Sequence, residues 1–142
     1  MVKAKDFWNI LCGDFNYRFF SGIPSLGLNN IYDKMNSKIM HYIPAASGAI
    51  ALGLVNGTRL TGVKSALLLK SDAILKLDFS FNYDSGIPAF IISDHNIYDK
   101  GLLDKFYLVN LSDDLEGCIS TIERKGLEVG TNSILFIGEG VL

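Results

Sequence analysis

Short apolar runs alternate with segments of helical periodicity from one end of the chain to the other. Each apolar run has four or five residues, the usual length of a strand. The run at 89–93 is apolar without alternation, as strands are when helices bury both faces of a parallel sheet. Strands are predicted at 16–20, 39–43, 65–69, 89–93, 106–109 and 134–137, and helices at 26–35, 46–61, 73–84 and 113–125.

The ends of the helical segments carry local signals. Ser25 and Ser112 precede two of them as predicted N-caps, and Gly62 and Gly126 follow two of them as predicted stops. Strands that alternate with helices imply right-handed crossovers between parallel strands. The expected fold class is therefore α/β: a single doubly wound domain over residues 1–142, with a mostly parallel six-stranded sheet and helices on both faces.

Composition excludes one class of partner and suggests another. The chain has 13 Lys and Arg against 15 Asp and Glu, a net charge of −2. This balance excludes the large basic patch that non-specific nucleic-acid binding needs, so no nucleic-acid partner is expected. Hydrophobic residues make up 49% of the chain, and the mean hydropathy is +0.26. So apolar a chain predicts that a partner covers some of its surface, in a homo- or hetero-oligomer.

One uncharged stretch, 39–58, is as long as a membrane span. It contains Pro44, Asn56 and Gly57, and its first five residues are typical of a strand. We therefore expect a buried strand followed by a buried helix, and no membrane partner. The first six residues lack the apolar core of a signal peptide, so a cytoplasmic location is expected.

Cysteine and histidine give no metal signature. Cys12 and Cys118 have no metal-ligand spacing, and no cysteine or carboxylate near His41 or His95 completes a ligand set, so no metal site is expected in this chain. His41 is interpreted as a structural residue of its strand. His95 follows the strand at 89–93, at the edge where open parallel sheets bind ligands. A ligand contact and an ordinary loop histidine are equally consistent with its position.

Three short segments stand in the order and at the spacing of motifs in one enzyme family. Residues 19–24 read Phe-Phe-Ser-Gly-Ile-Pro, and residues 41–62 begin His-Tyr-Ile-Pro-Ala-Ala-Ser-Gly and end Thr-Gly. Residues 87–93 read Ile-Pro-Ala-Phe-Ile-Ile-Ser. Together they resemble the pyrimidine-binding domain of thiamine-diphosphate enzymes, with the phosphonopyruvate and sulfopyruvate decarboxylases as the best match.

The resemblance implies a pyrimidine-side (α-type) subunit of a two-chain, thiamine-diphosphate-dependent 2-oxo acid decarboxylase. In such an enzyme the cofactor does the carbanion chemistry, and the protein supplies orientation and a proton relay. Sulfopyruvate-type enzymes can carry the Gly-Asp-Gly…Asn signature, which holds diphosphate through magnesium, on a separate subunit. Gly13-Asp14-Phe15 is not that signature. Diphosphate and magnesium are therefore expected on a separate diphosphate-binding partner subunit, with the cofactor shared between the two chains.

The resemblance also implies site residues. Family enzymes place a glutamate after the second strand, where it hydrogen-bonds the aminopyrimidine ring and helps to form the reactive ylid. This chain has Ser47 there, whose hydroxyl is too weak an acid to relay that proton well. Ser47 also suits a plain helix N-cap, and Lys70 an ordinary exposed charge. The implied cofactor contacts are Ser47, Gly48, Lys70 and Ser71, and the implied substrate contacts are Pro24, Ser25 and His95.

The missing glutamate leaves other functions open. All four glutamates lie in the last third of the chain, so none is an evident replacement for it. The first alternative is a catalytically degenerate domain of this family with a structural or regulatory role. The second is an unrelated α/β module that binds a small ligand, because fold alone does not carry activity with it.

Overall fold

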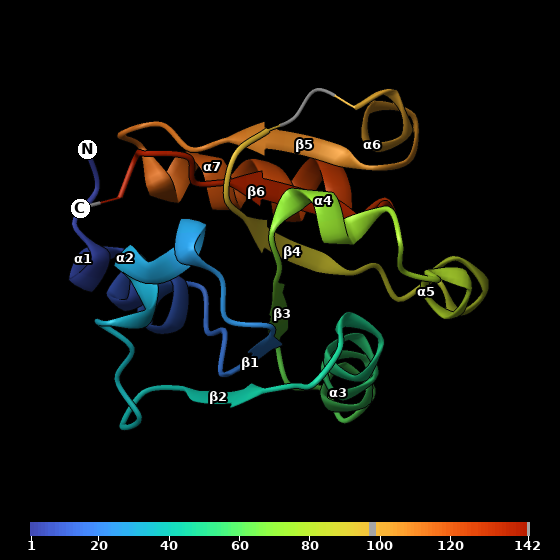
Figure 1. The fold of residues 1–142 in the computed structure, drawn as a ribbon, viewed down its shortest axis with the longest axis horizontal. Helices are drawn as coiled ribbons and strands as arrows, with labels where there is room; N and C mark the ends of the chain where they lie inside the picture. Colours follow the sequence, from blue (N-terminus) through green and yellow to red (C-terminus); the bar gives the residue numbers. More distant parts are fainter. Residues whose placement is uncertain (97–98, 142) are drawn as a thin grey trace.

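The strands lie side by side in one parallel sheet (Figure 1). The computed structural model describes residues 1–96 and 99–141. The strand order is β2-β1-β3-β4-β6-β5, and every neighbouring pair is parallel. The expected α/β class with six strands is confirmed, and the sheet is parallel throughout. The strands are β1 (Phe19–Gly22), β2 (His41–Pro44), β3 (Ser65–Leu68), β4 (Phe90–Ser93), β5 (Tyr107–Asn110) and β6 (Ser133–Phe136).

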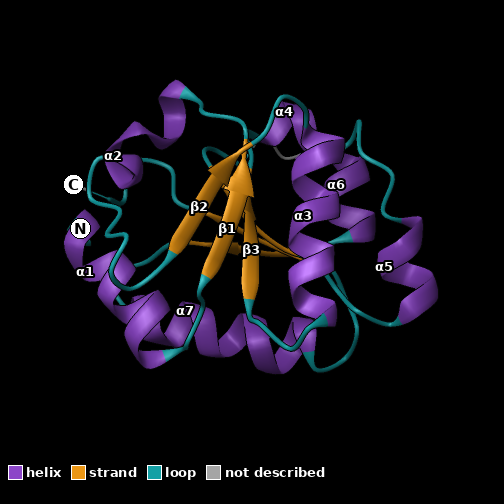
Figure 2. Ribbon diagram, turned by 90° about the horizontal axis from the view of Figure 1, so that it is seen from below, coloured by secondary structure: helices purple, strands orange, loops and turns teal. Residues whose placement is uncertain are grey.

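Helices cover both faces of this sheet. Figure 2 shows α3 and α5 on one side of β1–β3, with α1 and α2 on the other. α1 continues as a π-helical turn, Asn9–Asp14, and α7 as another, Glu123–Leu127. The α-helices of the described residues are α1 (Ala4–Trp8), α2 (Asn29–Tyr32), α3 (Gly48–Leu60), α4 (Ser71–Ile74), α5 (Ser80–Ser85), α6 (Lys100–Lys105) and α7 (Leu115–Ile122).

Two hydrophobic cores result, one on each face. Phe90 and Ile92 point into the core formed with α1, α2 and α7, whereas Ile91 points into the core formed with α3 and α4. All three side chains are fully buried. The unbroken apolar run of β4 follows directly, because successive side chains of a strand alternate between faces and both faces are covered.

Two predicted helices are broken in the structure. Segment 26–35 forms a 3₁₀ turn, Leu26–Leu28, followed by the short α2, and segment 73–84 is divided between α4 and α5. The second break has a local cause. The Asp78 carboxylate accepts hydrogen bonds from the N–H and the hydroxyl of Ser80, and these bonds lower the pKa of Asp78. Such an Asx turn competes with continuous helix and starts a new one.

Several predicted helix ends were also wrong. α7 is capped by Asp114, whose carboxylate accepts from the Gly117 N–H at 3.0 Å. Ser112 instead accepts from the Asp114 N–H at 3.3 Å, and it lies two residues before the N-cap position of the helix. Gly126 does not stop the helix, because the chain stays helical through Leu127. Ser25 does occupy the N-cap position of the turn that follows it, but without a side-chain cap bond.

The uncharged stretch 39–58 is not buried as predicted. Its strand, β2, is one of the two edge strands of the sheet, and Ile43 on it is 48% exposed. Its helix, α3, buries one face and leaves Ile50 54% exposed on the other. The prediction was wrong because an apolar sequence does not show whether the residues are covered by the same chain or by another one. Among the described residues, no helix has both the length and the apolar character to cross a membrane.

An ionic cluster ties the end of α7 to the amino edge of the sheet. Lys64 and Glu123 form an ion pair, and the Tyr17 hydroxyl donates to the same Glu123 oxygen at 3.2 Å. The Lys64 ammonium lies 4.5 Å from the centre of the Tyr17 ring. Burial, and then the Glu123 charge, raise the pKa of Tyr17, so this hydroxyl stays a donor. Glu123 is thereby committed to a structural role at this edge.

The backbones of β1 and β3 come unusually close where the two strands end. A Cβ added to Gly22 would lie 1.9 Å from the Leu68 carbonyl oxygen, which is a backbone atom with little freedom to move. We predict that Gly22→Ala lowers the free energy of unfolding by about 3 kcal/mol, the upper end for overpacking, as measured by urea unfolding. Gly57→Ala is the matched control, because a Cβ at Gly57 meets nothing within 4 Å. On the exposed side of α3, this control is expected to stabilise by about 0.5–1 kcal/mol. Equal effects of the two variants would contradict the prediction.

Candidate functional site

The loops that follow β1 and β3 enclose a cavity at the carboxyl edge of the sheet. The chain passes from β1 to β2 in one direction along the sheet and returns to β3 on the other side of β1. At such a reversal the loops diverge and leave a crevice in which open α/β sheets bind ligands. The cavity has a volume of about 390 Å³, and residues 23–26, Leu69, Lys70 and Ala73 line it.

Three of the residues expected to bind ligand meet at this cavity. Pro24 and Ser25 line it from the loop after β1, and Lys70 from the loop after β3. The Lys70 ammonium is more than half exposed and lies 3.8 Å from Asp72. It therefore presents a solvated positive charge at the mouth of a mostly apolar hollow, an arrangement that suits a small ligand with a carboxylate.

Asp94 joins the two walls of the cavity. Its carboxylate accepts from the Ser71 N–H at 2.9 Å and from the Ser93 hydroxyl at 3.3 Å. On the other wall, a Cβ added to Gly27 would lie 2.8 Å from the Asp94 Cβ. The site therefore depends on an acid that sequence reasoning missed. Its only signal was an aspartate directly after a buried strand, at the ligand-binding edge of a parallel sheet.

Ser47 and Gly48 lie at the start of α3. The Ile50 N–H donates to the Ser47 hydroxyl at 3.2 Å, so Ser47 is the N-cap of α3. Ser47 is half-buried, and its own hydroxyl proton remains available for one more hydrogen bond. A Cβ added to Gly48 would lie 2.9 Å from a Leu77 methyl group, which shows how closely the helix start packs. Neither residue lines the 390 Å³ cavity.

The structure separates His95 from Pro24 and Ser25. His95 lines another hollow of about 380 Å³, together with residues at and after the ends of β5 and β6, including Asn110 and Glu139. The expected substrate contacts are thus divided between two hollows at the same sheet edge. Ser71 is 4% exposed, and its N–H is the Asp94 partner. Among the described residues, no three His, Cys, Asp or Glu side chains gather to hold a metal ion.

An apolar surface lies next to Ser47. The outer side of α3 presents Ile50, Leu54 and Leu60, each at least 36% exposed. Gly53 and Gly57 lie on the same side of the helix, where an added Cβ would meet nothing. These five residues are called the α3 face below. The buried side of the same helix packs into the core, so α3 is apolar on both sides, as a helix is when two bodies enclose it.

The Asp94 bridge can be tested without a known ligand. Asp94→Ala leaves the Ser71 N–H without its acceptor, so we expect a loss of about 2 kcal/mol in unfolding free energy. The Ser71 amide should also exchange faster with deuterium. Asp72→Ala is the matched control, because the ion pair of this aspartate with Lys70 is exposed and such pairs contribute about 0–1 kcal/mol, so it should change both measurements little. Similar amide exchange in the two variants would mean that Asp94 does not hold the walls together.

Comparison with known proteins gives a likeness of fold. No protein-family model matches the chain, and no curated protein does. Among solved structures, the chain is similar to a 2-oxoglutarate:ferredoxin oxidoreductase from Magnetococcus marinus with 2-oxoglutarate, coenzyme A and succinyl-CoA bound, at a TM-score of 0.64 and 13% identity. The match covers 95% of this chain and 28% of that one, so this chain spans less than a third of its neighbour. At this identity the likeness shows a shared fold: a parallel, doubly wound α/β domain.

Proposed function

We propose that this chain is the pyrimidine-side subunit of a two-chain, thiamine-diphosphate-dependent 2-oxo acid decarboxylase, similar to phosphonopyruvate and sulfopyruvate decarboxylase. One observation carries the proposal. The three segments that resemble family motifs, 19–24, 41–62 and 87–93, are separate in the sequence, yet each contains a strand that ends at the same sheet edge. The strands of the first two segments, β1 and β2, are also neighbours in the sheet, so the ends of these segments lie side by side.

The likeness to an enzyme with 2-oxoglutarate bound supports the substrate class. 2-Oxoglutarate is a 2-oxo acid, and the enzyme that binds it contains a domain of this fold. Loss of carbon dioxide from a 2-oxo acid leaves a carbanion, which thiamine diphosphate stabilises when it is bound. A cavity of about 390 Å³ suits a small acid of this kind.

The residues of this chain have positioning roles in the proposal. The Ser47 hydroxyl accepts from the Ile50 N–H and can donate its own proton to a ring nitrogen. It fits as a hydrogen-bonding partner of the aminopyrimidine and not as a proton relay. Gly48 lets the start of α3 approach the aminopyrimidine ring closely. Lys70 was expected to contact the cofactor, but it lines the cavity with Pro24 and Ser25 and is proposed here to attract the carboxylate of the substrate. Ser71, also expected to contact the cofactor, fixes the Lys70 loop through Asp94.

The diphosphate half of the site is assigned to a separate subunit, which would also hold the magnesium ion. The 142 residues lack the Gly-Asp-Gly…Asn signature. The α3 face begins within one turn of Ser47, so a subunit that covers it would bring its own groups next to the pyrimidine position. Covering that face also removes exposed apolar surface from water, which is the main favourable term in most association.

A catalytically degenerate domain with a structural or regulatory role is the second candidate. This candidate is favoured because two side chains that could take part in catalysis already have structural roles. Ser47 already has a role as the cap of α3, and Glu123 is paired with Lys64 at the opposite edge of the sheet. In this alternative the chain keeps the fold and the α3 face and lacks turnover.

Tagged purification from the native host, with mass spectrometry of the co-purifying chains, tests the two-chain proposal. We expect recovery of a chain that carries the Gly-Asp-Gly…Asn signature. Recovery of the protein alone, or with unrelated chains, would leave half a cofactor site without a complement and would exclude the catalytic proposal.

Ile50→Glu tests whether the α3 face forms the subunit contact. A buried, unpaired carboxylate in the interface should weaken association with the co-purified subunit by at least about 100-fold, the cost of roughly 2.8 kcal/mol. The fold should survive, because Ile50 is 54% exposed. Val129→Glu is the control, since Val129 is 73% exposed and lies outside the α3 face. Equal affinities of both variants in titration calorimetry would place the contact elsewhere.

Ser47→Glu tests the chemistry. Assembled with the partner subunit, this variant should retain or gain thiamine-diphosphate-dependent release of carbon dioxide. The gain can reach about 100-fold, at the lower end of what a positioned acid contributes. Ser47→Ala should lose activity, together with about 1 kcal/mol of stability from the missing cap. No carbon dioxide from either the natural chain or Ser47→Glu, with no bound cofactor, would favour the degenerate domain.

A further inference from the structure

The outer edge of β2 offers backbone groups that pair with no other strand in the described structure. β2 is the last strand in the sheet order, and Figure 1 shows it at the margin of the sheet. The His41 N–H donates to the Arg18 carbonyl at 2.8 Å, and the Ala45 N–H to the Gly22 carbonyl at 2.9 Å. Alternate residues of a strand bond to opposite sides, so Tyr42 and Pro44 face outward.

Pro44 limits where another strand can add. Proline has no N–H to donate, and natural sheets use it to close exposed edges. The carboxyl end of β2 is therefore blunted. The N–H and carbonyl of Tyr42, together with the Met40 carbonyl before it, remain at the amino half of the strand.

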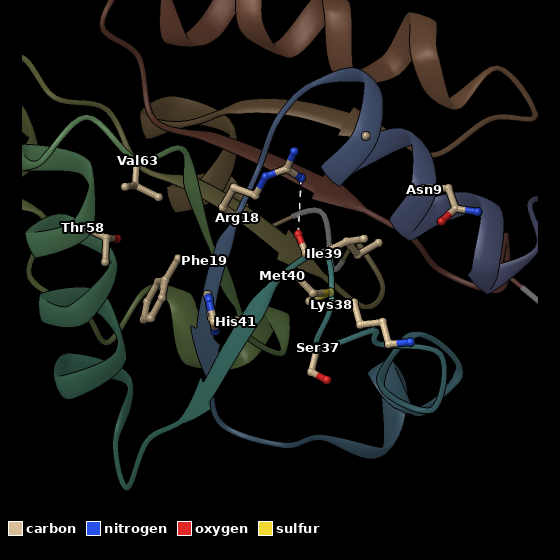
Figure 3. A pocket seen from close by; sticks show the side chains of 11 residues that line it. Asn9, Arg18, Phe19, Ser37, Lys38, Ile39, Met40, His41, Thr58 and Val63 are labelled. Carbon is tan, nitrogen blue, oxygen red and sulfur yellow. Dashed lines mark hydrogen bonds between the residues drawn. The ribbon is translucent and has the colours of Figure 1, made fainter.

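Two large hollows flank this amino half. One has a volume of about 670 Å³ and the other about 610 Å³, larger than either hollow at the carboxyl edge. Both are lined by Phe19, Ser37, Met40 and His41. Figure 3 shows the larger one, between the end of α3 at Thr58 and the loop that leads into β2. An added strand sends alternate side chains to opposite faces, and hollows beside an edge accept them.

The charge around β2 is positive. Arg18, Lys38 and His41 line the larger hollow, and no aspartate or glutamate is among its described lining residues. In Figure 3 these three side chains lie at separate places around the hollow and do not converge on one point. Such spacing suits several negative charges along a chain better than one small anion.

The amino-terminal part of the chain, which includes β1 and β2, has an excess of positive charge in its sequence. Residues 1–64, which include β1 and β2, carry seven Lys and Arg against three Asp and Glu, a net charge of +4. Residues 65–142 carry six against twelve, a net charge of −6. A second copy that paired through its own β2 would bring like charges together, whereas an acidic segment would be attracted.

We propose that the edge of β2 binds an extended acidic segment of another protein, which adds to the sheet as a further strand beyond β2. The backbone of Met40 and Tyr42 provides the pairing, and the flanking hollows receive alternate side chains. Arg18 and Lys38 attract the negative charge. This binding does not depend on the proposed enzymatic function, because it uses neither the α3 face nor the cavity at the carboxyl edge.

Defined peptides test the proposal on the full chain. The probe is an acetylated, amidated nonapeptide, Glu-Val-Glu-Val-Thr-Val-Glu-Val-Glu, titrated into ¹⁵N-labelled protein and followed by amide chemical shifts. We expect saturable shifts at Tyr42 and its neighbours. The same peptide with lysine for every glutamate, and a version with proline for threonine, should each bind at least about tenfold more weakly, because they lose the charge attraction and a ladder hydrogen bond respectively.

A variant pair separates local charge from overall charge. Lys38→Glu should weaken binding of the acidic peptide by about tenfold, or about 1.4 kcal/mol. Lys76→Glu makes the same charge change at an exposed position outside both hollows and should have little effect. Equal binding of acidic and basic peptides, or shifts confined to residues away from β2, would overturn the proposal. Dimerisation through β2 in sedimentation would do so as well, since a second copy would then be the occupant.

Discussion

The approach of β1 to β3 at Gly22 is the contact on which the candidate site at the carboxyl edge depends. These strands lie at the reversal of the sheet, and their continuations form the two walls of the 390 Å³ cavity. Without a side chain at Gly22, the walls start close together and then diverge. Asp94, at the end of the next strand, fixes their separation by bonding to Ser71 and packing against Gly27. The width of the cavity is therefore set by backbone contacts and one carboxylate, and not by the residues that face it.

The sheet also explains where the protein is open to other molecules. Its central strands are enclosed between two cores, so they offer nothing to a partner. The surfaces that other molecules can reach lie at the periphery of the sheet. They are the α3 face, the hollows beside β2, and the cavity between the loops at the carboxyl edge. These three regions have different chemistry. The first is apolar, the second is positively charged, and the third is a small crevice with one lysine at its mouth.

Local patterns in the sequence predicted the strands and the fold class well, because β-branched and apolar runs such as that of β4 report directly on burial at both faces. These patterns were less reliable where two neighbouring residues are both suited to the same structural position. Ser112 and Asp114 are both good caps, and only the path of the chain decides between them. The role of Asp94 depends on Gly27, far away in the sequence, and no local pattern encodes such a contact. The exposure of Ile43 and Ile50 also could not be predicted, since composition does not say which molecule covers an apolar residue.

Because α3 is apolar on both sides, its exposed side affects how long the protein persists in a cell. Residues 39–58 contain no charged side chain to discourage aggregation, and half of the helix they form is uncovered in a lone copy. Chaperones and proteases act on surfaces of this kind. If a partner subunit covers this face as proposed, a copy without that subunit would be held or degraded, while an assembled copy would escape. The steady amount of this chain would then follow the supply of its complement more closely than its own rate of synthesis.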